Sequence, residues 1–554
     1  MFSVLKMSGV RLKILPEHKT GNIIRNMQGE YMTEAGNNYS EKKTQLHISV
    51  RNLVEFIFRE GDIDNRSSRA MSADAMMEGT RIHRKIQGSM GKEYQAEVPL
   101  SLVVEGDLYE LTVEGRADGI FTEDGKCFVD EIKGMYRKVE LFEKPVFVHR
   151  AQAMCYAYIF ALQNNMETIG IQMTYCNLET EQTKYFREEF SFEEIKKWFD
   201  DLMEEYGKWA TFQCEMKNQR QASIKELDFP YEYRPGQKKL VSDVYRTIMR
   251  QKLLFMQAPT GVGKTISTIF PAVKAVGEEL ADRIFYLTAK TITATVAKET
   301  FALLEKNGYR AKTIQITAKE KLCPCDEMEC NPVTCPYAKG HFDRVNDAVF
   351  DLLHRCEMIE RDDILSQADR YTVCPFELCL DTASWCDNII CDYNYVFDPN
   401  VYLKRFFQEG IKGDYIFLID EAHNMVERSR QMYSAQIYKE DFLTVKRIMK
   451  EHSHSIEKAL EKCNKILLGM KRECENYTVY DTFGNMVFSF MRLMTLLDEF
   501  LQKANEFPGK KDVMDFYFEL RNFLNIYDLV DEHYVMYSEL EADGRFMQIG
   551  RAHV

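Results

Sequence analysis

The spacing of apolar and polar positions divides the chain into stretches of different character. Short, uninterrupted apolar runs at Leu253–Met256 and Tyr415–Ile419 are typical of strands buried in a parallel sheet. A third strand-like run, Arg283–Thr288, lies between them, and Ile266–Val276 has helical character. Strands that alternate with helices predict an α/β domain with a parallel sheet in the middle of the chain.

The first part of the chain has another pattern. Two segments of helical periodicity, Ser49–Phe58 and Ala70–Gln87, are followed by four strand-like runs at Tyr94–Val104, Leu108–Val113, Arg116–Phe121 and Lys126–Ile132. The turn Glu123-Asp-Gly125 would join the last two runs as neighbouring strands, and an apolar helix, Ala151–Leu162, comes later. A separate mixed α/β domain with a small sheet is expected here.

The end of the chain has helical periodicity from Val426 onward. The amphipathic segments are Lys439–Lys450, Ser455–Met470, Met486–Phe507 and Val513–Leu529. Between the two predicted α/β domains, Glu215–Glu226 is polar and carries Lys217, Arg220 and Lys225. We expect this stretch to be a linker.

Composition indicates an ordinary globular protein. Its 554 residues suffice for three or four domains, with 45% apolar and 29% charged residues. A net charge of −14 argues against an evenly basic surface, so contacts with nucleic acid would need local Lys and Arg clusters. No apolar run approaches the roughly 18 residues of a membrane span. Charged residues interrupt Met1–Leu15, which lacks a secretory cleavage site. We expect a cytoplasmic protein without membrane contact.

The segment after the first buried strand has the chemistry of a phosphate-binding loop. Glycines there let the backbone approach phosphates, whose charge faces the N–H groups at the start of the helix. Lys264 would reach the β- and γ-phosphates, and the Thr265 hydroxyl would hold Mg²⁺. Ala258 stands where the strict pattern has glycine. The predicted site for ATP and Mg²⁺ comprises Thr260, Gly261, Gly263, Lys264 and Thr265.

Two other strands of the central domain end in polar residues. Tyr415–Ile419 runs into Asp420-Glu-Ala-His423, in which Asp420 would hold Mg²⁺ through water and Glu421 would polarise the water that attacks the γ-phosphate. His423 would couple the nucleotide state to DNA contacts. After the run Arg283–Thr288, the Thr288 hydroxyl and the Lys290 ammonium could contact the phosphates of a DNA strand.

A second set of catalytic residue types lies in the N-terminal sheet. The spacing of Asp118 and Glu131 suits neighbouring strands and would bring both carboxylates to one end of the sheet. Such oxygens can hold Mg²⁺ or Mn²⁺ against a scissile phosphate. Lys133, on the same strand face as Glu131, could orient the attacking water. The predicted chemistry is metal-assisted phosphodiester hydrolysis.

Cysteines are concentrated in one part of the chain. Of 15 cysteines, nine fall between Cys323 and Cys391. In a long chain such a cluster favours a metal or cluster site over a disulfide scaffold. The candidate ligands suit either tetrahedral zinc or an iron–sulfur cluster, and their spacing alone does not decide between the two: Cys323, Cys325, Cys330, Cys335 and Cys374.

In the central domain, these motifs resemble the XPD/DinG family of superfamily-two helicases. The resemblance lies in the Ala-x-x-Gly-x-Gly-Lys-Thr loop, the DEAH box and a cysteine insertion that ends in Cys374-Pro-Phe-Glu377. It implies a RecA-like domain with a [4Fe-4S] cluster held by Cys323, Cys330, Cys335 and Cys374, with Cys325 as an alternative to Cys323. It also implies that Gln237 hydrogen-bonds adenine and that Tyr231 or Tyr233 stacks on it. Tyr393 and Tyr395 could stack on bases or be buried in the sheet.

In the N-terminal domain, the residues resemble the RecB-like branch of the PD-(D/E)XK nucleases. Gly115-Arg-Ala-Asp118 and Asp130-Glu131-Ile-Lys133 carry this resemblance, together with Gln152-Ala-Met-Cys-Tyr156. It implies that His83, Asp118 and Glu131 are metal ligands and that Lys133 is the catalytic lysine. Gln152 and Tyr156 would organise the site or contact DNA. A degenerate domain that only grips DNA is the alternative.

The expected organisation follows from these motifs. Its parts are an extension at 1–44, a nuclease domain at 45–212, a linker at 213–228, a RecA-like domain at 229–316 and 390–430, an iron–sulfur domain at 317–389 and a partial helical arch at 431–554. Codons for Gln28-Gly-Glu30 suggest a ribosome-binding sequence, so translation could start at Met32. The second RecA-like domain that the resemblance implies is absent, and Ile549–Val554 back-translates to an adapter sequence, so we expect a truncated reading frame.

The expected activity is an ATP-dependent 5′→3′ DNA helicase in DNA repair or replication, acting on single-stranded and forked DNA. An associated nuclease with Mg²⁺ or Mn²⁺ is also expected. Phosphoryl transfer without the arginine of a second domain would lose roughly 10³-fold or more, so this chain should unwind poorly. The alternatives are an ATP-regulated nuclease or DNA clamp without unwinding, and a zinc-containing ATPase. No protein partner is indicated.

Overall fold

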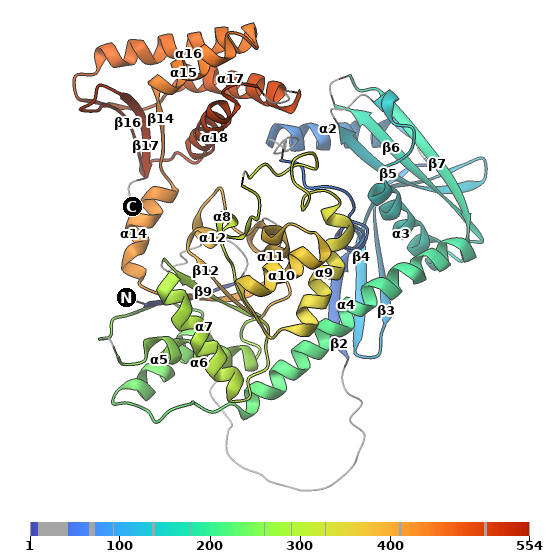
Figure 1. Ribbon diagram of the computed structural model, residues 1–554. Helices are drawn as coiled ribbons and strands as arrows, with labels where there is room; N and C mark the ends of the chain where they lie inside the picture. Colours follow the sequence, from blue (N-terminus) through green and yellow to red (C-terminus); the bar gives the residue numbers. More distant parts are fainter. Residues whose placement is uncertain are drawn as a thin grey trace, which may run out of the picture.

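The computed structural model describes residues 2–8, 43–65, 73–91, 93–135, 139–178, 180–259, 261–289, 291–326, 328–408, 411, 413–503 and 507–552. Met32, Thr260 and Lys290, each the subject of a prediction above, lie outside the described residues. The described chain forms three sheets with their helices (Figure 1). None of its helices combines the length and apolar content that a membrane span needs.

The first sheet belongs to the N-terminal domain. Its strand order is β2-β4-β5-β6-β7, with β3 paired to β4 off this path. β4 and β5 are antiparallel, with Gly119 opposite Asp130, whereas β5 and β6 are parallel. The strands are β2 (Thr44–Ser49), β3 (Gln95–Glu105), β4 (Tyr109–Glu123), β5 (Lys126–Met135), β6 (Thr168–Asn177) and β7 (Thr183–Ser191).

The hairpin predicted between Asp118 and Glu131 is confirmed. Asp124 and Gly125 make its turn with φ of 51° and 79°, a left-handed conformation that Gly and Asp tolerate. The prediction of separate strands at Leu108–Val113 and Arg116–Phe121 is wrong, because both belong to β4. Glu114 and Gly115 continue the pairing with β3 between them.

Helices cover the first sheet in two unequal groups. The main core packs α1 (Val50–Ile57), α3 (Phe147–Gln163) and the first part of α4 (Phe192–Glu226) against the strands. A short 3₁₀ turn, Val139–Leu141, precedes α3. In contrast, α2 (Ala73–Ser89) packs through Ile82 and Ile86 in a small separate cluster with Ile132 and Cys176.

The linker predicted at 213–228 is wrong in form, because α4 continues through it to Glu226. This 35-residue helix starts at a capping box of Ser191 and Glu194. Its buried residues lie in three different hydrophobic cores: Phe199 in the N-terminal core, Trp209 and Phe212 in a second core, and Ile224 in a third. Apolar residues recur at helical spacing among the polar ones, so the segment stays helical. Helix α4 thereby connects the two α/β domains.

The second sheet forms the central domain. Its order is β11-β10-β12-β9-β13-β1-β8, and β1 (Phe2–Ser8) pairs antiparallel with both β13 and β8. The remaining pairs are parallel, as the run Tyr415–Ile419 predicted. The prediction of a buried parallel strand at Leu253–Met256 is wrong, because β8 ends the sheet, pairs antiparallel with β1 and leaves Leu253 and Phe255 exposed. These strands are β8 (Leu254–Met256), β9 (Arg283–Thr288), β10 (Thr313–Gln315), β11 (Met358–Ile359), β12 (Asn388–Asp392) and β13 (Asp414–Ile419).

Helices cover both faces of the second sheet. Ile284 and Tyr286 of β9 pack in one core, while Phe285 and Leu287 pack in the other, because side chains alternate along a strand. The first core includes α5 (Gln237–Met249), α6 (Lys264–Gly277) and α7 (Thr291–Lys306). The second includes α9 (His341–Arg355), α10 (Arg361–Tyr371) and α11 (Pro375–Ala383).

The cysteine-rich insertion is joined to the sheet more closely than predicted. It begins with α8 (Lys319–Leu322), continues through the cysteine loop to α9, and returns to the sheet edge, where β11 pairs with β10. The segment between the predicted boundaries at 317 and 389 is therefore not separate from the sheet, and the boundaries are wrong in this respect. After β12 come α12 (Asn394–Phe397) and α13 (Lys404–Phe407), and a 3₁₀ turn, Ala422–Asn424, follows β13.

The C-terminal region contains a sheet as well as the predicted helices. Its helices are α14 (Met425–Met432), α15 (Lys439–Met449), α16 (His454–Glu473), α17 (Gly484–Lys503) and α18 (Lys510–Tyr527). The expectation of helices alone is wrong, because four strands form the order β14-β17-β16-β15. They are β14 (Ala435–Tyr438), β15 (Tyr477–Tyr480), β16 (Tyr534–Leu540) and β17 (Phe546–Ala552). These strands are short, so their alternation was hidden beside the helices.

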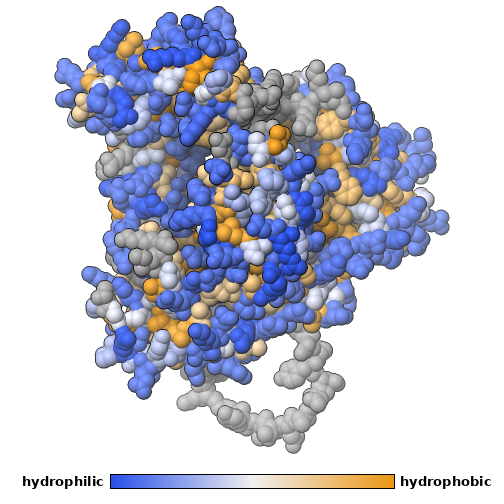
Figure 2. Space-filling view, in the orientation of Figure 1, coloured by the Kyte–Doolittle hydropathy of each residue, from blue (hydrophilic) through white to orange (hydrophobic). Residues whose placement is uncertain are grey.

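The visible surface is largely hydrophilic. In the view of Figure 2, hydrophobic residues form scattered patches among hydrophilic ones. This agrees with 29% charged residues and a net charge of −14.

Candidate functional sites

The predicted phosphate-binding loop connects β8 to α6. Gly263 caps the helix with φ of 76°, and Gly261 has φ of 84°. These left-handed conformations favour glycine, which explains both residues. The hydroxyl of Ser267 donates to the Gly263 carbonyl at 2.8 Å. Helix α6 begins at Lys264, so its free N–H groups lie next to the loop, where a phosphate would be stabilised.

Asp420 directly follows β13, so it lies at the carboxyl ends of the strands, where the loop also lies. Its carboxylate accepts a hydrogen bond from the Tyr286 hydroxyl at 3.1 Å and is almost fully buried. Burial raises the pKa of Asp420, while the Tyr286 hydroxyl and the nearby Lys264 ammonium oppose that rise. Lys264 and Asp420 are therefore electrostatic neighbours although 156 positions separate them in the sequence.

Tyr286 was missed as a site residue. Within the apolar run Arg283–Thr288 a tyrosine is expected to be a core residue, and Tyr286 is indeed fully buried. Its hydroxyl nevertheless interacts with both Thr265 and Asp420, the two predicted Mg²⁺ ligands. Polar tips of buried tyrosines need a partner, and that rule was the available signal.

Gln237 supports the loop in this structure. Its side-chain amide donates to the Val262 carbonyl at 3.2 Å and to the Ser267 hydroxyl at 3.1 Å, and its oxygen accepts from the Arg234 N–H at 3.0 Å. The contacts tie the start of α5 to the phosphate loop. Contact of Gln237 with adenine stays a prediction, as does stacking by Tyr231, which is exposed, or by Tyr233, which stacks on Phe229.

The remaining predicted residues of the central domain differ in exposure. His423 is exposed, with its Nδ1 at 3.3 Å from the Glu421 carboxylate. Thr288 is buried and its hydroxyl contacts that of Thr293. Tyr393 is fully buried and donates to the Asp420 carbonyl, so it is not available to stack on bases. Tyr395 packs partly buried against the second core.

In the N-terminal domain, the predicted nuclease residues gather around one end of the β4–β5 hairpin. His83 on α2 places Nδ1 at 3.7 Å from Oδ1 of Asp118. The other Asp118 oxygen accepts from the Ile132 N–H at 2.7 Å. Lys133 contacts Glu131 at 2.7 Å and Gln152 at 3.4 Å. Tyr156 interacts with Gln152 in turn. The six predicted residues therefore form two groups, His83–Asp118 and Glu131–Lys133–Gln152–Tyr156, which the Ile132 backbone joins.

The electrostatics of this set favour a bound cation. Burial raises the pKa of Glu131 to about 8, with Lys133 acting against it and Asp118 adding to it. Burial also raises the pKa of Asp118, opposed by His83. The Glu131 Oε2 atom is buried and has no hydrogen-bond partner. A divalent cation would satisfy that oxygen and compensate the charge of the two carboxylates. The chemistry of the donor set suits Mg²⁺ or Mn²⁺, while the ligand atoms of His83, Asp118 and Glu131 do not all lie within 4.8 Å of one another.

A further acid, Asp130, was missed. It is completely buried and accepts from the Thr174 hydroxyl at 2.6 Å and from the Tyr94 hydroxyl at 3.1 Å. These donors satisfy it locally, which favours a structural role next to Glu131. The Gln87 amide also holds the hairpin by donating to the Asp118 carbonyl at 2.9 Å.

The candidate cluster ligands come from the loop after α8 and from the start of α11. The Cys325 and Cys335 sulfurs are 3.8 Å apart, and Cys323 lies close to Cys325. Cys374 caps α11, where burial raises the pKa of its thiol to about 11 and the Phe376 and Glu377 N–H groups oppose that rise. Burial would lower the pKa of Lys319, but the Cys330 and Cys374 sulfurs outweigh it and raise that pKa.

This donor set fits a thiolate-held cluster. Among the described residues, one group of three or more potential ligands has all its ligand atoms within 4.8 Å of one another: Asp531, Glu532 and His533, all exposed. The cysteines are spread more widely than that. Thiolates are the usual ligands of an iron–sulfur cluster and also hold zinc, and the 3.8 Å between the Cys325 and Cys335 sulfurs is the spacing of a tetrahedral zinc site, so these distances do not decide between the two. Of the other cysteines in this part of the chain, Cys379, Cys386 and Cys391 are buried and Cys356 is half-buried.

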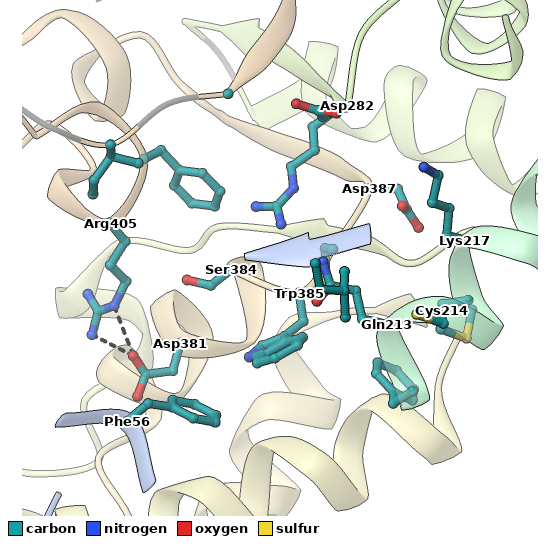
Figure 3. Close-up of a pocket in the computed structure, with 18 of the residues that line it drawn as sticks. Phe56, Gln213, Cys214, Lys217, Asp282, Asp381, Ser384, Trp385, Asp387 and Arg405 are labelled. Atoms are coloured by element: carbon teal, nitrogen blue, oxygen red, sulfur yellow. Dashed lines mark hydrogen bonds and ion pairs between the residues drawn. The ribbon is translucent and has the colours of Figure 1, made fainter. Parts of the chain in front are cut away.

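A cavity of about 780 Å³ lies at the amino ends of strands of the central sheet. Asp282 before β9 and Asp387 before β12 line it (Figure 3). Arg283 at the start of β9 and Tyr415 near the start of β13 also line it. The N-terminal domain contributes Phe56, and α4 contributes Lys217 and Arg220. Since Lys264 and Asp420 follow strand ends at the opposite edge, this cavity is separate from the nucleotide site.

Known proteins resemble this chain in the segment after the phosphate loop. Residues 303–442 match the DEAD_2 family, a segment that contains the five candidate cysteines and the DEAH box. The chain is 20% identical over 248 residues to regulator of telomere elongation helicase 1 from Rattus norvegicus. It is 24% identical over 232 residues to the general transcription and DNA repair factor IIH helicase subunit XPD/RAD3 from Saccharomyces cerevisiae.

These relatives are much longer than the matched part. Each alignment covers 36% of this chain but 19% of the rat protein and 29% of the yeast protein. Among solved structures, one titled "XPD_Helicase" has a TM-score of 0.36 at 16% identity and covers 58% of this chain and 54% of its own. One titled "Truncated XPD" has a TM-score of 0.35 at 15% identity, covering 56% and 85%. The chain is thus similar, over part of its length, to the DEAD_2 family and to these two helicases.

Proposed function

We propose that this protein is an ATP-dependent DNA helicase of the XPD/DinG type that moves 5′→3′ along single-stranded and forked DNA. One observation carries the proposal. Lys264 and Asp420 follow two different strands of the central sheet and become electrostatic neighbours at one edge, with Tyr286 bonded to Asp420. Ligands of α/β sheets bind at this edge, beyond the carboxyl ends of the strands.

The central domain would use its residues as follows. Bound Mg²⁺ neutralises charge on the phosphates of ATP. Gly261, Gly263 and the start of α6 would bind the phosphates through backbone N–H groups, and Lys264 would add its charge. Thr265 and Asp420 would hold Mg²⁺, and Glu421 would orient the attacking water. Thr260 and Lys290 belong to the same proposal as phosphate-binding residues of ATP and DNA.

The cysteine insertion would hold a [4Fe-4S] cluster. Cys330, Cys335 and Cys374 would be ligands together with Cys323 or Cys325, which lie close to each other. The cluster would supply a rigid thiolate-bonded centre that shapes the DNA-contacting insertion. Lys319 would stabilise negative charge on the Cys330 and Cys374 sulfurs.

A metal-dependent DNA nuclease is the second proposed function, in the N-terminal domain. A specific observation favours it: His83 contacts Asp118, Lys133 contacts Glu131 and Gln152, and one buried Glu131 oxygen has no partner. The Ile132 N–H, between Glu131 and Lys133 in the chain, donates to Asp118 and joins the two groups. Asp118, Glu131 and His83 would hold Mg²⁺ or Mn²⁺, and Lys133 would orient water near the scissile phosphate. Tyr156 would position Gln152.

The motor proposal is tested with purified protein and a Lys264→Ala variant. Wild-type protein should show ATPase activity that single-stranded DNA stimulates, and the variant should lose it. Lys239→Ala, an exposed lysine on α5, is the matched control and should retain it. Equal ATPase activity in all three proteins would reject the motor. Strand displacement by the full gene product separates a helicase from an ATP-regulated clamp.

The nuclease proposal is tested separately by cleavage of labelled DNA with Mn²⁺. Asp118→Asn should abolish cleavage. Asp124→Asn removes the same charge at the exposed hairpin turn, where asparagine tolerates the left-handed φ, and should cleave normally. Cleavage that survives Asp118→Asn would reject the proposed site, and wild-type protein that binds DNA without cleaving it would leave a domain that only grips DNA.

The cluster proposal is tested by anaerobic purification with iron, sulfide and zinc assays. A brown protein with about four iron atoms per chain is expected. A colourless protein with stoichiometric zinc would replace the cluster by a zinc site.

A further inference from the structure

We infer that residues 56–65 of the N-terminal domain, here called the strap, hold the proposed cysteine ligands in position. The strap joins the loop that bears Cys330 and Cys335 to the helix that bears Cys374. Docking of the N-terminal domain and binding of a cluster by the cysteines are then thermodynamically coupled. The coupling to a cluster rests on the proposed function, whereas the docking of the strap does not.

The strap follows the cysteine loop by backbone hydrogen bonds. The Asn65 N–H donates to the carbonyl of Cys330 at 2.9 Å, and the Ile63 N–H donates to the carbonyl of Ala338 at 2.9 Å. Between these two points lies Cys335, whose own N–H donates to the Asn331 carbonyl at 3.0 Å. The strap thus fixes both ends of the segment that carries two proposed ligands.

The strap also holds the start of α9. The Gly340 N–H donates to Oδ1 of Asp62 at 2.6 Å, and the Gly61 N–H donates to Oδ1 of Asp343 at 2.7 Å. The Phe342 N–H donates to the Gly61 carbonyl at 3.0 Å. Gly61 has φ of 92°, so a side chain at this position would be strained.

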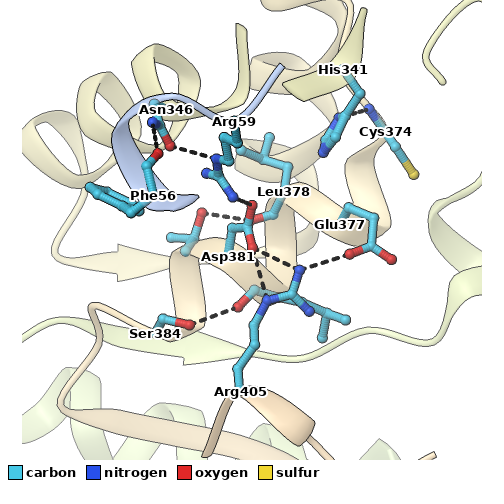
Figure 4. A network of polar contacts seen from close by, with 12 residues as sticks. Phe56, Arg59, His341, Asn346, Cys374, Glu377, Leu378, Asp381, Ser384 and Arg405 are labelled. Atoms are coloured by element: carbon cyan, nitrogen blue, oxygen red, sulfur yellow. Dashed lines mark hydrogen bonds and ion pairs between the residues drawn. The ribbon is translucent and has the colours of Figure 1, made fainter. Parts of the chain in front are cut away.

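His341, between these contacts, links α9 to the fourth ligand. Its Nδ1 accepts a hydrogen bond from the Cys374 N–H at 3.1 Å (Figure 4). The backbone of Cys374 is therefore held by a residue whose two neighbours, Gly340 and Phe342, are bonded to the strap.

Arg59 makes the second connection to the Cys374 helix. Its guanidinium donates to Oδ2 of Asp381 on α11 at 2.8 Å and to the side-chain oxygen of Asn346 on α9 at 2.8 Å (Figure 4). Arg405 bonds the other Asp381 oxygen and also Glu377, one turn after Cys374. The Arg59 and Asp381 side chains are 19% and 9% exposed, so solvent screens their ion pair only partly.

These contacts make the cysteine centre dependent on residues about 280 positions earlier in the chain. Without the strap, four backbone groups of the loop and of α9 would lose their partners, and Asp381 would keep only Arg405. Hydrogen bonds to charged groups contribute about 1.5–3 kcal/mol, which corresponds to a factor of about 10 to 100. A loop loosened by that factor would release its ligand more readily.

The test compares single variants of the full chain. Arg59→Ala removes the contacts to Asp381 and Asn346, and Asp62→Ala removes the acceptor of Gly340. Arg51→Ala is the matched control, because Arg51 lies exposed on α1 and pairs only locally with Glu55. Asp62→Asn keeps a side-chain oxygen and should behave like wild type.

Two measurements distinguish the coupling from the cluster itself. In metal-free protein, hydrogen–deuterium exchange of residues 328–343 should rise in Arg59→Ala and Asp62→Ala but not in the two controls. In protein reconstituted with iron and sulfide, a chelator should remove iron about ten times faster from Arg59→Ala. Reciprocally, loading should slow exchange in residues 56–65 of wild-type protein.

Each outcome tests either the role of the strap or the cluster proposal. Unchanged exchange and unchanged iron release in both strap variants would overturn the role of the strap. If wild-type protein takes up no iron, the cluster proposal fails, and exchange in metal-free protein still tests the strap. Should Arg59→Ala fail to fold, the exposed Asp62 gives the variant that carries the test.

Discussion

The two candidate catalytic centres hold their acidic groups in different ways. In the N-terminal centre, Glu131 is fully buried and one of its oxygens has no partner. In the central domain, Asp420 is also buried, but Tyr286 donates to it and the Glu421 N–H caps its other oxygen at 2.9 Å. The first centre leaves a buried carboxylate oxygen without a partner, whereas both oxygens of the second have a hydrogen-bond donor.

The centres also differ in how the chain assembles them. The N-terminal set comes from the β4–β5 hairpin and from helices α2 and α3, which pack next to β5, so its residues are close in sequence. The nucleotide set comes from strand ends that other elements separate, and the parallel sheet aligns them at one edge. We therefore expect the two centres to fail independently when residues are changed, and to respond differently to loss of charge.

The largest expected effect separates the two centres. Lys133→Met should reduce Mn²⁺-dependent DNA cleavage by roughly 10²- to 10³-fold, because a charged donor beside the scissile phosphate is lost. ATP binding, measured with a fluorescent analogue, should not change. Lys126→Met on the same strand removes only an exposed pair with Glu189 and is the control. A matching loss of ATP binding would contradict independence.

The second effect contrasts the two buried acids in stability. The folded pKa of Glu131 is about 8, above the ordinary value near 4.5, so its favourable contribution is complete below pH 4.5 and is lost as the pH rises through 8. In metal-free protein at pH 7, Glu131→Gln should therefore stabilise the N-terminal domain by about 3 kcal/mol while abolishing cleavage.

Chemical denaturation in the presence of a chelator measures this change. Asp420→Asn is the comparison, and we expect a much smaller gain because Tyr286 and the Glu421 N–H already stabilise the carboxylate. A gain as large as that of Glu131→Gln would show that the two centres carry similar electrostatic strain.

A third effect concerns acid sensitivity of the N-terminal domain. Burial lowers the pKa of His149 to about 4, and its ring contacts the Tyr175 hydroxyl at 3.1 Å. The neutral ring is favoured in the fold, so its contribution is complete above pH 6.5 and is lost as the pH falls toward 4. At pH 5 the loss should be about 2 kcal/mol.

His149→Gln should weaken this dependence between pH 7.5 and 5. Thermal unfolding at both pH values measures it, with His47→Gln, an exposed histidine on β2, as control. An unaltered pH dependence in His149→Gln would mean that other groups cause the acid sensitivity.

The smallest effect tests how firmly the protein preorganises the nucleotide loop. Gln237→Ala removes three hydrogen bonds around Val262, Ser267 and Arg234. ATP affinity should fall by roughly ten-fold, since one unsatisfied buried group costs about 1–3 kcal/mol. Titration with a fluorescent ATP analogue gives the affinity, and Gln251→Ala, in an exposed loop, serves as control. Unchanged affinity would limit Gln237 to packing.

Much of both centres could be predicted where the signal is local. The hairpin that brings Asp118 to Glu131 follows from strand periodicity and a Gly-containing turn, and the phosphate loop follows from its glycines. Tyr286 and Asp130 were not recognised, because a tyrosine in an apolar run and one of two adjacent acids resemble ordinary strand residues, although a buried tyrosine hydroxyl needs a partner. Their roles depend on partners from other strands, Asp420 and Thr174.

The sequence by itself determined the strands and the helix around the phosphate loop, the two sets of catalytic residue types and the cysteine-rich stretch, because each depends on residues that are close along the chain. Only the tertiary structure decided that α4 would join three cores rather than form a linker, and that Arg59 would bond Asp381, 322 positions away. Periodicity records which face of an element is buried. It does not record which distant surface will cover that face, since that choice depends on packing and hydrogen bonding across the whole fold.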